Sequence, residues 1–219
     1  MRDRGSGTPR VGADGKASRL PVRRASGMAD RMTRTHDPRI FALVAALGAL
    51  GVLWRVLPHE VNVAPVAALA MFGAWAARRA WVGAGLALGV LIASDLILGR
   101  LQSGFAYDPA LQAVVWGALA LPALFARALP ARARRALAWC ALPAVAASAS
   151  FFLLTNGAVW ALGGAYPRTP SGLAAAYAAG IPFIRGTLTG DLAFTLALFG
   201  GAALAEARGL LPTRKALPA

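Results

Sequence analysis

Four hydrophilic side chains interrupt stretches that are otherwise apolar, and their chemistry could bind a small solute. Asp95 and Asp191 are carboxylates, and Asn62 and Asn156 are amides. Inserting an ionisable residue into a bilayer costs about 2.5–3.5 kcal/mol on insertion scales. We therefore expect two acids and two amides at one depth to have a function. Carboxylates and amides together supply hydrogen-bond acceptors and donors. These four side chains and that of Arg55 are the predicted substrate-binding residues.

Two other interpretations of these residues stay open. In the first, Asp95 pairs with Arg55 or Arg100, and Asp191 pairs with Arg185. The polar residues would then only hold together a structural or assembly protein. In the second, Asp95 and Asp191 share a proton, as in an intramembrane aspartyl-type enzyme. The sequence around both acids lacks part of the motif of such enzymes, so we expect no enzymatic activity.

The composition predicts a polytopic membrane protein. Of 219 residues, 58% are hydrophobic and 15% are charged, and the mean hydropathy is +0.56. A soluble domain carries about 25% charged residues, so this chain lacks the charge to coat a soluble surface. The single cysteine, Cys140, excludes a disulfide scaffold. The lipid bilayer is therefore the first expected partner.

Six apolar segments must position the polar residues. They cover about 39–57, 61–77, 80–98, 110–126, 136–158 and 186–205. At about 1.5 Å per residue, such lengths cross most of a core about 30 Å thick. We therefore predict an all-α domain of six transmembrane helices over 39–205. A disordered, basic cytoplasmic tail precedes it over 1–38, and a short cytoplasmic tail follows over 206–219.

The distribution of basic residues predicts the orientation of the chain. With the N-terminus inside, the inner segments hold 19 basic residues and the outer segments hold four. The positive-inside rule then predicts an N-in, C-in, multi-pass protein of the bacterial cytoplasmic (inner) membrane. Met1, Met28 and Met32 are alternative starts, and a start at Met28 still leaves 12 against four. The net charge of +14 does not indicate nucleic-acid binding, because the basic residues lie at the ends of apolar runs.

On this topology, the polar residues gather in the outer half of the bundle. Asp95 lies about 6 Å deep and Asp191 about 9 Å deep, from the rise per residue of a helix. The longest outer connection contains a short apolar stretch, 172–184, that Pro182 interrupts. This stretch is too short to span, so we expect it to lie at the interface or to re-enter the membrane.

Residues of fixed spacing run through about positions 50–200. They are Arg55-x-x-Pro58-His59-x-x-Asn62-x-x-Pro65-Val66, Ser94-Asp95, Thr155-Asn156-x-x-x-Trp160 and Thr187-Leu188-x-Gly190-Asp191. The pattern resembles the signature of an uncharacterised family of bacterial six-span membrane proteins. More distantly, the chain is similar to the S component of energy-coupling-factor vitamin transporters. That resemblance implies capture of a micronutrient from outside, and docking on an energising module through small residues of the first span, here Ala42 and Ala46.

These observations predict a small-solute-binding subunit or a small transporter with an outward-facing polar cavity. The predicted partner is a small polar solute, together with an energising transporter module. No cofactor and no metal are predicted, because His59 has no further histidine or cysteine near it. No Walker A, G-x-S-x-G or H-E-x-x-H motif occurs.

Overall fold

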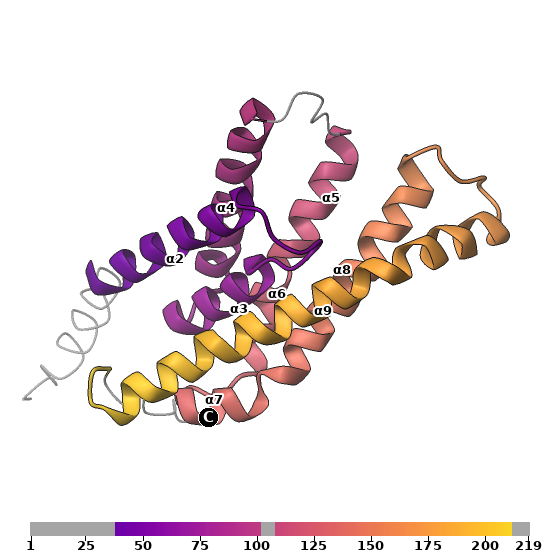
Figure 1. Ribbon diagram of the computed structural model, residues 1–219. Coiled ribbons are helices and arrows are strands. Elements are labelled where there is room, and N and C mark those ends of the chain that lie inside the picture. Colours follow the sequence, from indigo (N-terminus) through magenta and orange to yellow (C-terminus); the bar gives the residue numbers. More distant parts are fainter. Residues whose placement is uncertain (1–37, 102–107, 212–219) are drawn as a thin grey trace, which may run out of the picture. The chain divides into compact units, whose positions relative to one another are not determined.

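The computed structural model describes residues 38–101 and 108–211, which fold into helices (Figure 1). In chain order the elements are α2 (Pro38–Val56), α3 (Val66–Ala77), α4 (Ala80–Leu101), α5 (Pro109–Ala120), α6 (Pro122–Phe125), η2 (Ala126–Ala128), α7 (Ala133–Trp139), α8 (Ala141–Leu162) and α9 (Pro170–Ala207). The described residues contain no strand, which confirms the predicted all-α class. The predicted N-terminal tail up to residue 37 and residues 212–219 of the predicted C-terminal tail lie outside the described residues.

Four helical stretches are long and apolar enough to cross a membrane. They are α4, the run Pro109–Ala128 that joins α5, α6 and η2, then α8 and α9. The apolar helices α2 and α3 are shorter. About 20 apolar residues span a hydrocarbon core of about 30 Å. The length and composition of these helices therefore agree with the predicted membrane-embedded protein.

Helix α3 is the most enclosed element. Its residues Val66–Ala76 are all buried, and it packs against α4, α6 and α9. The ring of Phe199 in α9 lies edge-on to those of Phe72 and Trp75 in α3, with centroids 5.3 and 5.1 Å apart. Edge-to-face pairs add to the stabilisation that burial gives. These rings fix α9 against the centre of the bundle.

Small residues allow α3 and α4 to pack closely. A Cβ on Gly83 would overlap the backbone of Ala70 and Ala74. Packing of this kind holds helices together in lipid, where the hydrophobic effect does not. Only Arg78 and Arg79 join the two helices, and Arg78 takes a left-handed φ of 58° as the C-cap of α3. The result is a short hairpin with two arginines at its turn.

The connection between α2 and α3 is not helical and lies against α9. Asn62 has a left-handed φ of 62°, and the indole of Trp54 donates to the carbonyl of Val63 at 2.7 Å. A Cβ on Gly186 in α9 would overlap the carbonyl of Val61. The connection therefore approaches α9 closely, and this contact places Asn62 beside that helix.

The predicted segment 136–158 forms two helices rather than one. Helix α7 ends at Trp139 and α8 begins at Ala141. The backbone N–H of Ala133, at the start of α7, donates to the Glu206 carboxylate at 3.0 Å. Glu206 is near the end of α9, so the bond ties the start of α7 to the C-terminal end of α9.

The stretch 172–184 is the first part of α9, so the expected break at Pro182 is wrong; its place at the interface or within the membrane stays a prediction. The helix continues through Pro182 for 38 residues, or about 57 Å at about 1.5 Å per residue. Thr169 caps its start by accepting a hydrogen bond from the N–H of Gly172 at 3.2 Å. A proline removes one donor and kinks a helix, but a packed helix can continue past it. Helix α9 is therefore longer than a hydrocarbon core of about 30 Å.

Candidate functional site

The structure divides the five predicted substrate-binding residues between two places. Arg55 and Asp95 contact each other between α2 and α4. Asn62 and Asn156 line one pocket beside α9, and Asp191 is buried in α9 itself. Within the described chain, no hydrogen bond links the first pair to the other three. The structure therefore pairs Arg55 with Asp95 and brings Asn62 and Asn156 to one pocket, while a single cavity lined by all five residues stays a prediction.

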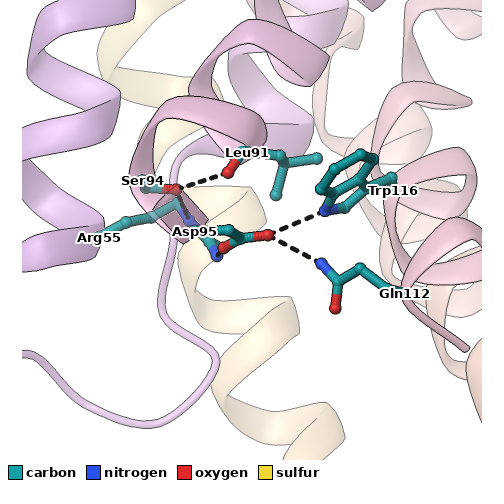
Figure 2. A network of polar contacts seen from close by, with 6 residues as sticks. All are labelled: Arg55, Leu91, Ser94, Asp95, Gln112 and Trp116. Carbon is teal, nitrogen blue, oxygen red and sulfur yellow. Dashed lines mark hydrogen bonds and ion pairs between the residues drawn. The ribbon is translucent and has the colours of Figure 1, made fainter. Parts of the chain in front are cut away.

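Figure 2 shows the first group, which we call the Asp95 cluster: Arg55, Ser94, Asp95, Gln112 and Trp116. Nη2 of Arg55 lies 2.6 Å from Oδ1 of Asp95, and Nε of Arg55 donates to Oγ of Ser94 at 2.7 Å. The other carboxylate oxygen, Oδ2, accepts from the Gln112 amide at 2.8 Å and the Trp116 indole at 2.9 Å. The cluster thus connects α2, α4 and α5.

The polar groups of the Asp95 cluster mainly bond one another. The side chains of Arg55 and Asp95 are 18% and 8% exposed. Burial strengthens a charge-assisted hydrogen bond but also makes an unpaired charge costly. Both carboxylate oxygens already have donors, so little capacity remains for a solute. Of the open pairings for Asp95, the structure shows the one with Arg55. The contacts of Arg55 and Asp95 are those of an interhelical link, and their role as solute ligands stays a prediction.

The second group surrounds a pocket of about 200 Å³ between α8, α9 and the connection before α3. Its polar lining comes from Asn62, Thr155, Asn156 and Thr187. Its other lining residues are Phe151, Phe152, Gly180, Phe183 and Ile184. We call it the small pocket. Its lining combines polar and aromatic side chains.

Gly180 makes room for the Asn156 amide. A Cβ at this position in α9 would overlap the amide group of Asn156 in α8. Nδ2 of Asn156 donates to the carbonyl of Phe152, four residues earlier in α8, at 2.8 Å. That carbonyl can only accept, so it settles which side of the amide is nitrogen. The amide oxygen is then the free acceptor at the pocket.

The small pocket presents mainly acceptors. The hydroxyls of Thr155 and Thr187 donate to carbonyls in their own helices, at 2.8 and 3.2 Å. Their oxygen lone pairs stay available, because a hydroxyl has two acceptor positions besides its donor. The Asn62 amide makes no hydrogen bond within the described residues. The pocket therefore suits a solute that carries N–H or O–H donors.

Asp191 lies one helical turn beyond Thr187, and Thr195 follows one turn later; all three are buried. Ser148 in α8 donates to Oδ2 of Asp191 at 2.7 Å. Arg185 is exposed and, within the described residues, forms no ion pair with Asp191. Oγ1 of Thr195 is buried without a partner. Buried polar groups without partners are costly, so this face of α9 has unused hydrogen-bonding capacity.

The two acids do not form a dyad through hydrogen bonds. An aspartyl dyad requires its carboxyl groups to be in contact. The partners of Asp95 are in α2 and α5, whereas the side chain that bonds Asp191 is Ser148 of α8. No hydrogen bond between the acids occurs in the described part of the chain.

His59 and Glu60 lie in the exposed connection between α2 and α3. Nδ1 of His59 is 2.8 Å from the carbonyl of Leu57, and its ring centroid is 6.2 Å from that of Trp54. No three His, Cys, Asp or Glu side chains gather in the described ranges. His59 thus contacts the end of α2 and the loop that follows it.

Three residues of the site were not anticipated from the sequence: Gln112, Trp116 and Ser148. Gln112 is a polar residue near the start of the predicted segment 110–126, and the indole N–H of a partly buried Trp116 needs an acceptor. These two features of the sequence could have identified Gln112 and Trp116 as site residues. Ser148 gave a weaker signal, because serines in helices often bond their own backbone, as Ser150 does at 2.7 Å.

Comparison with known proteins gives one match. Residues 35–214 match a family described as a family of unknown function (DUF6580). No curated protein and no solved structure matches the chain. The match covers every described helix.

Proposed function

Because the chain belongs to the DUF6580 family, whose function is unknown, we propose a function from the site itself: a small-solute-binding subunit or small transporter. One observation carries the proposal. Asn62, Thr155, Asn156 and Thr187 come from a loop and two helices, yet they line one pocket. Sites that bind small molecules combine an apolar wall with a few convergent polar groups.

The lining predicts the class of solute. The volume of about 200 Å³ is below the roughly 300–1,000 Å³ of drug-sized sites. The polar groups are uncharged and mainly acceptors, and Phe151, Phe152 and Phe183 each lie one helical turn before one of them. We therefore propose a small, uncharged solute that carries N–H or O–H donors on an apolar or aromatic body.

The proposal includes six membrane crossings with both termini in the cytoplasm of a bacterium, in the inner membrane. Contact between predicted inner segments supports it, because Arg78 and Arg79 of one such segment line the same cavity as Arg127 of another. The bond between Ala133 and Glu206 likewise joins two predicted inner segments. The small pocket would then open toward the outside.

The proposal also includes docking on an energising module, which rests on the similarity to S components. Ala42 and Ala46 are exposed on α2. Small residues allow a partner helix to approach closely in lipid. This face is therefore where we expect such a module to bind.

A structural or assembly role is the second candidate, and the Asp95 cluster favours it. That cluster joins three helices, and both oxygens of its carboxylate already accept hydrogen bonds. It does not account for the unbonded amide of Asn62, nor for the partnerless hydroxyl of Thr195. We therefore assign the Asp95 cluster to stability and the small pocket to binding.

The test is untargeted mass spectrometry of small molecules released from the purified protein. Thr187→Val and Asn156→Leu change the pocket lining. Thr189→Val is the matched control, because Thr189 is exposed on the same helix and does not line the pocket. One lost neutral hydrogen bond costs about 0.5–1.5 kcal/mol, so we expect a roughly twofold to tenfold loss of bound solute for Thr187→Val.

We expect a larger loss for Asn156→Leu, and the wild-type amount for Thr189→Val. The same molecules in equal amounts in all four proteins would contradict the binding proposal and favour the structural one. Loss in Thr189→Val as well would show that the solute binds elsewhere on α9.

A further inference from the structure

A second and larger cavity lies at the turn between α3 and α4. Its volume is about 750 Å³, within the range of roughly 300–1,000 Å³ found for ligand sites. Arg78, Arg79 and Arg127 line it, together with Trp75 and Trp81. We call it the arginine cavity. It shares no lining residue with the small pocket.

The charge of the arginine cavity is not balanced by the described protein. The described residues include five acids, and four of them accept hydrogen bonds elsewhere: Asp95, Asp108, Asp191 and Glu206. No ion pair joins Arg78, Arg79 or Arg127 to a carboxylate in residues 38–101 and 108–211. Three guanidinium groups around one cavity therefore attract an anion.

The backbone adds to this attraction. Helix α4 begins at Ala80, which lines the cavity. The first N–H groups of a helix lack intrahelical partners, and its N-terminus carries a partial positive charge. The left-handed φ of Arg78 and the bond from the Arg79 N–H to the carbonyl of Ala74 at 3.1 Å hold the turn in one conformation. The two arginines are thus presented on a fixed turn.

The rest of the lining is apolar and aromatic. The guanidinium of Arg79 lies 5.9 Å from the ring centroid of Trp81, and Trp81 is 67% exposed. The indole of Trp75 donates to the carbonyl of Pro130 at 2.8 Å. Ala74, Ala123, Ala126 and Leu129 supply further apolar surface. Tryptophan and arginine together are typical of the interface between lipid and water.

We propose that the arginine cavity binds the phosphate-bearing headgroup of an anionic phospholipid. Guanidinium groups recognise phosphate through charge-assisted, often bidentate hydrogen bonds. Basic pockets between membrane helices on the cytoplasmic side bind such headgroups. The apolar lining continues from the arginines, which suits an amphiphile rather than a free inorganic anion. The proposal rests on the inner position proposed above for the turn between α3 and α4, but not on the solute proposed for the small pocket.

The experiment measures lipid binding to the full-length protein in a neutral detergent. Phosphatidylglycerol, phosphatidylcholine and inorganic phosphate are each added, and the melting temperature and the lipid adducts in native mass spectra are recorded. The test variant is Arg79→Gln/Arg127→Gln. The matched control is Arg134→Gln/Arg135→Gln, which removes the same charge from two exposed arginines of α7 that do not line the cavity.

We expect phosphatidylglycerol to raise the melting temperature of the wild type and the control by several degrees. Its affinity for the test variant should fall at least tenfold, because a hydrogen bond to a charged group contributes about 1.5–3 kcal/mol. If part of this variant unfolds, lipid adducts are counted on the folded peak of the native mass spectra alone, so the comparison still measures binding. An equal effect of phosphatidylcholine, or an equal loss in the control, would overturn the proposal. An equal effect of inorganic phosphate would show a site for soluble anions and overturn the lipid assignment.

Discussion

Nη2 of Arg55 lies 2.6 Å from Oδ1 of Asp95, and this contact joins the C-terminal ends of two helices, α2 and α4 (Figure 2). Earlier in α2, Gly48 faces Leu86 of α4 and Gly51 faces Val90, so the contacts advance along both helices in the same direction. This is the arrangement expected for the first and third of successive antiparallel spans. The pair is therefore a structural link whose loss should loosen α2 from the bundle.

Asp95→Ala and Arg55→Ala should each destabilise the protein strongly. Each leaves one partly buried charge without its partner, and breaking a buried pair costs about 3–5 kcal/mol. The measurement is the free energy of unfolding in detergent. The double variant should cost clearly less than the sum of the single changes, because the second change removes a group that is already unpaired. Additive effects would show that the two side chains do not interact.

Ser148→Ala should destabilise the protein by about 1–3 kcal/mol, because it leaves the buried Asp191 without the donor that the structure shows. Ser150→Ala is the control two residues along α8. Its hydroxyl bonds only its own helix, to the carbonyl of Ala146, so its effect should stay within about 0.5 kcal/mol. Thermal unfolding of both variants measures the difference. Equal melting temperatures would argue against the bond between α8 and α9.

The sequence predicted the helices more reliably than their ends. Apolar runs predict α2, α4 and α8, because a helix within a bilayer must be apolar over much of the thickness of the hydrocarbon core. Pro182 gave a misleading signal, because packing of α9 against α8 and α3 outweighs the loss of one backbone hydrogen bond. Local pattern alone does not contain that packing.

The polar residues within the apolar segments could be identified from the sequence, but which of them lie together could not. Depth along a helix follows from residue count, so the polar side chains could be placed near one level. Which of them meet depends on how the helices rotate about their axes. Helices rich in alanine and glycine carry little information about rotation, so Asp95 and Asp191 could not be separated from the sequence.

Gly83→Ala should disrupt the hairpin of α3 and α4. The added methyl group would overlap backbone atoms of Ala70 and Ala74, and a backbone cannot move aside as a side chain can. Overpacking costs about 1–3 kcal/mol, sometimes more. Gly85→Ala is the control, because a Cβ there meets nothing within 4 Å. Gly85→Ala should be neutral or stabilising by up to about 1 kcal/mol. Equal yields and melting temperatures would contradict the close approach.

Gly180→Ala should remove solute binding, since the new methyl group would take the space of the Asn156 amide. The matched change in the same helix is Gly201→Ala, where a Cβ meets nothing within 4 Å. Mass spectrometry of the bound solute, normalised to folded protein, separates binding from stability. Retention of the solute by Gly180→Ala would show that the Asn156 amide is not one of its ligands.

Single cysteines should report the proposed topology directly. Cys140 is buried, so the wild type should react slowly with a membrane-impermeant maleimide. Ser171→Cys, at the exposed start of α9, should label on intact cells, because the proposal puts it outside. Arg134→Cys, on the exposed face of α7, should label only after the membrane is opened. Both side chains are exposed, so a difference in labelling reports their side of the membrane rather than their burial. The opposite pattern would invert the topology and move the small pocket to the cytoplasmic side.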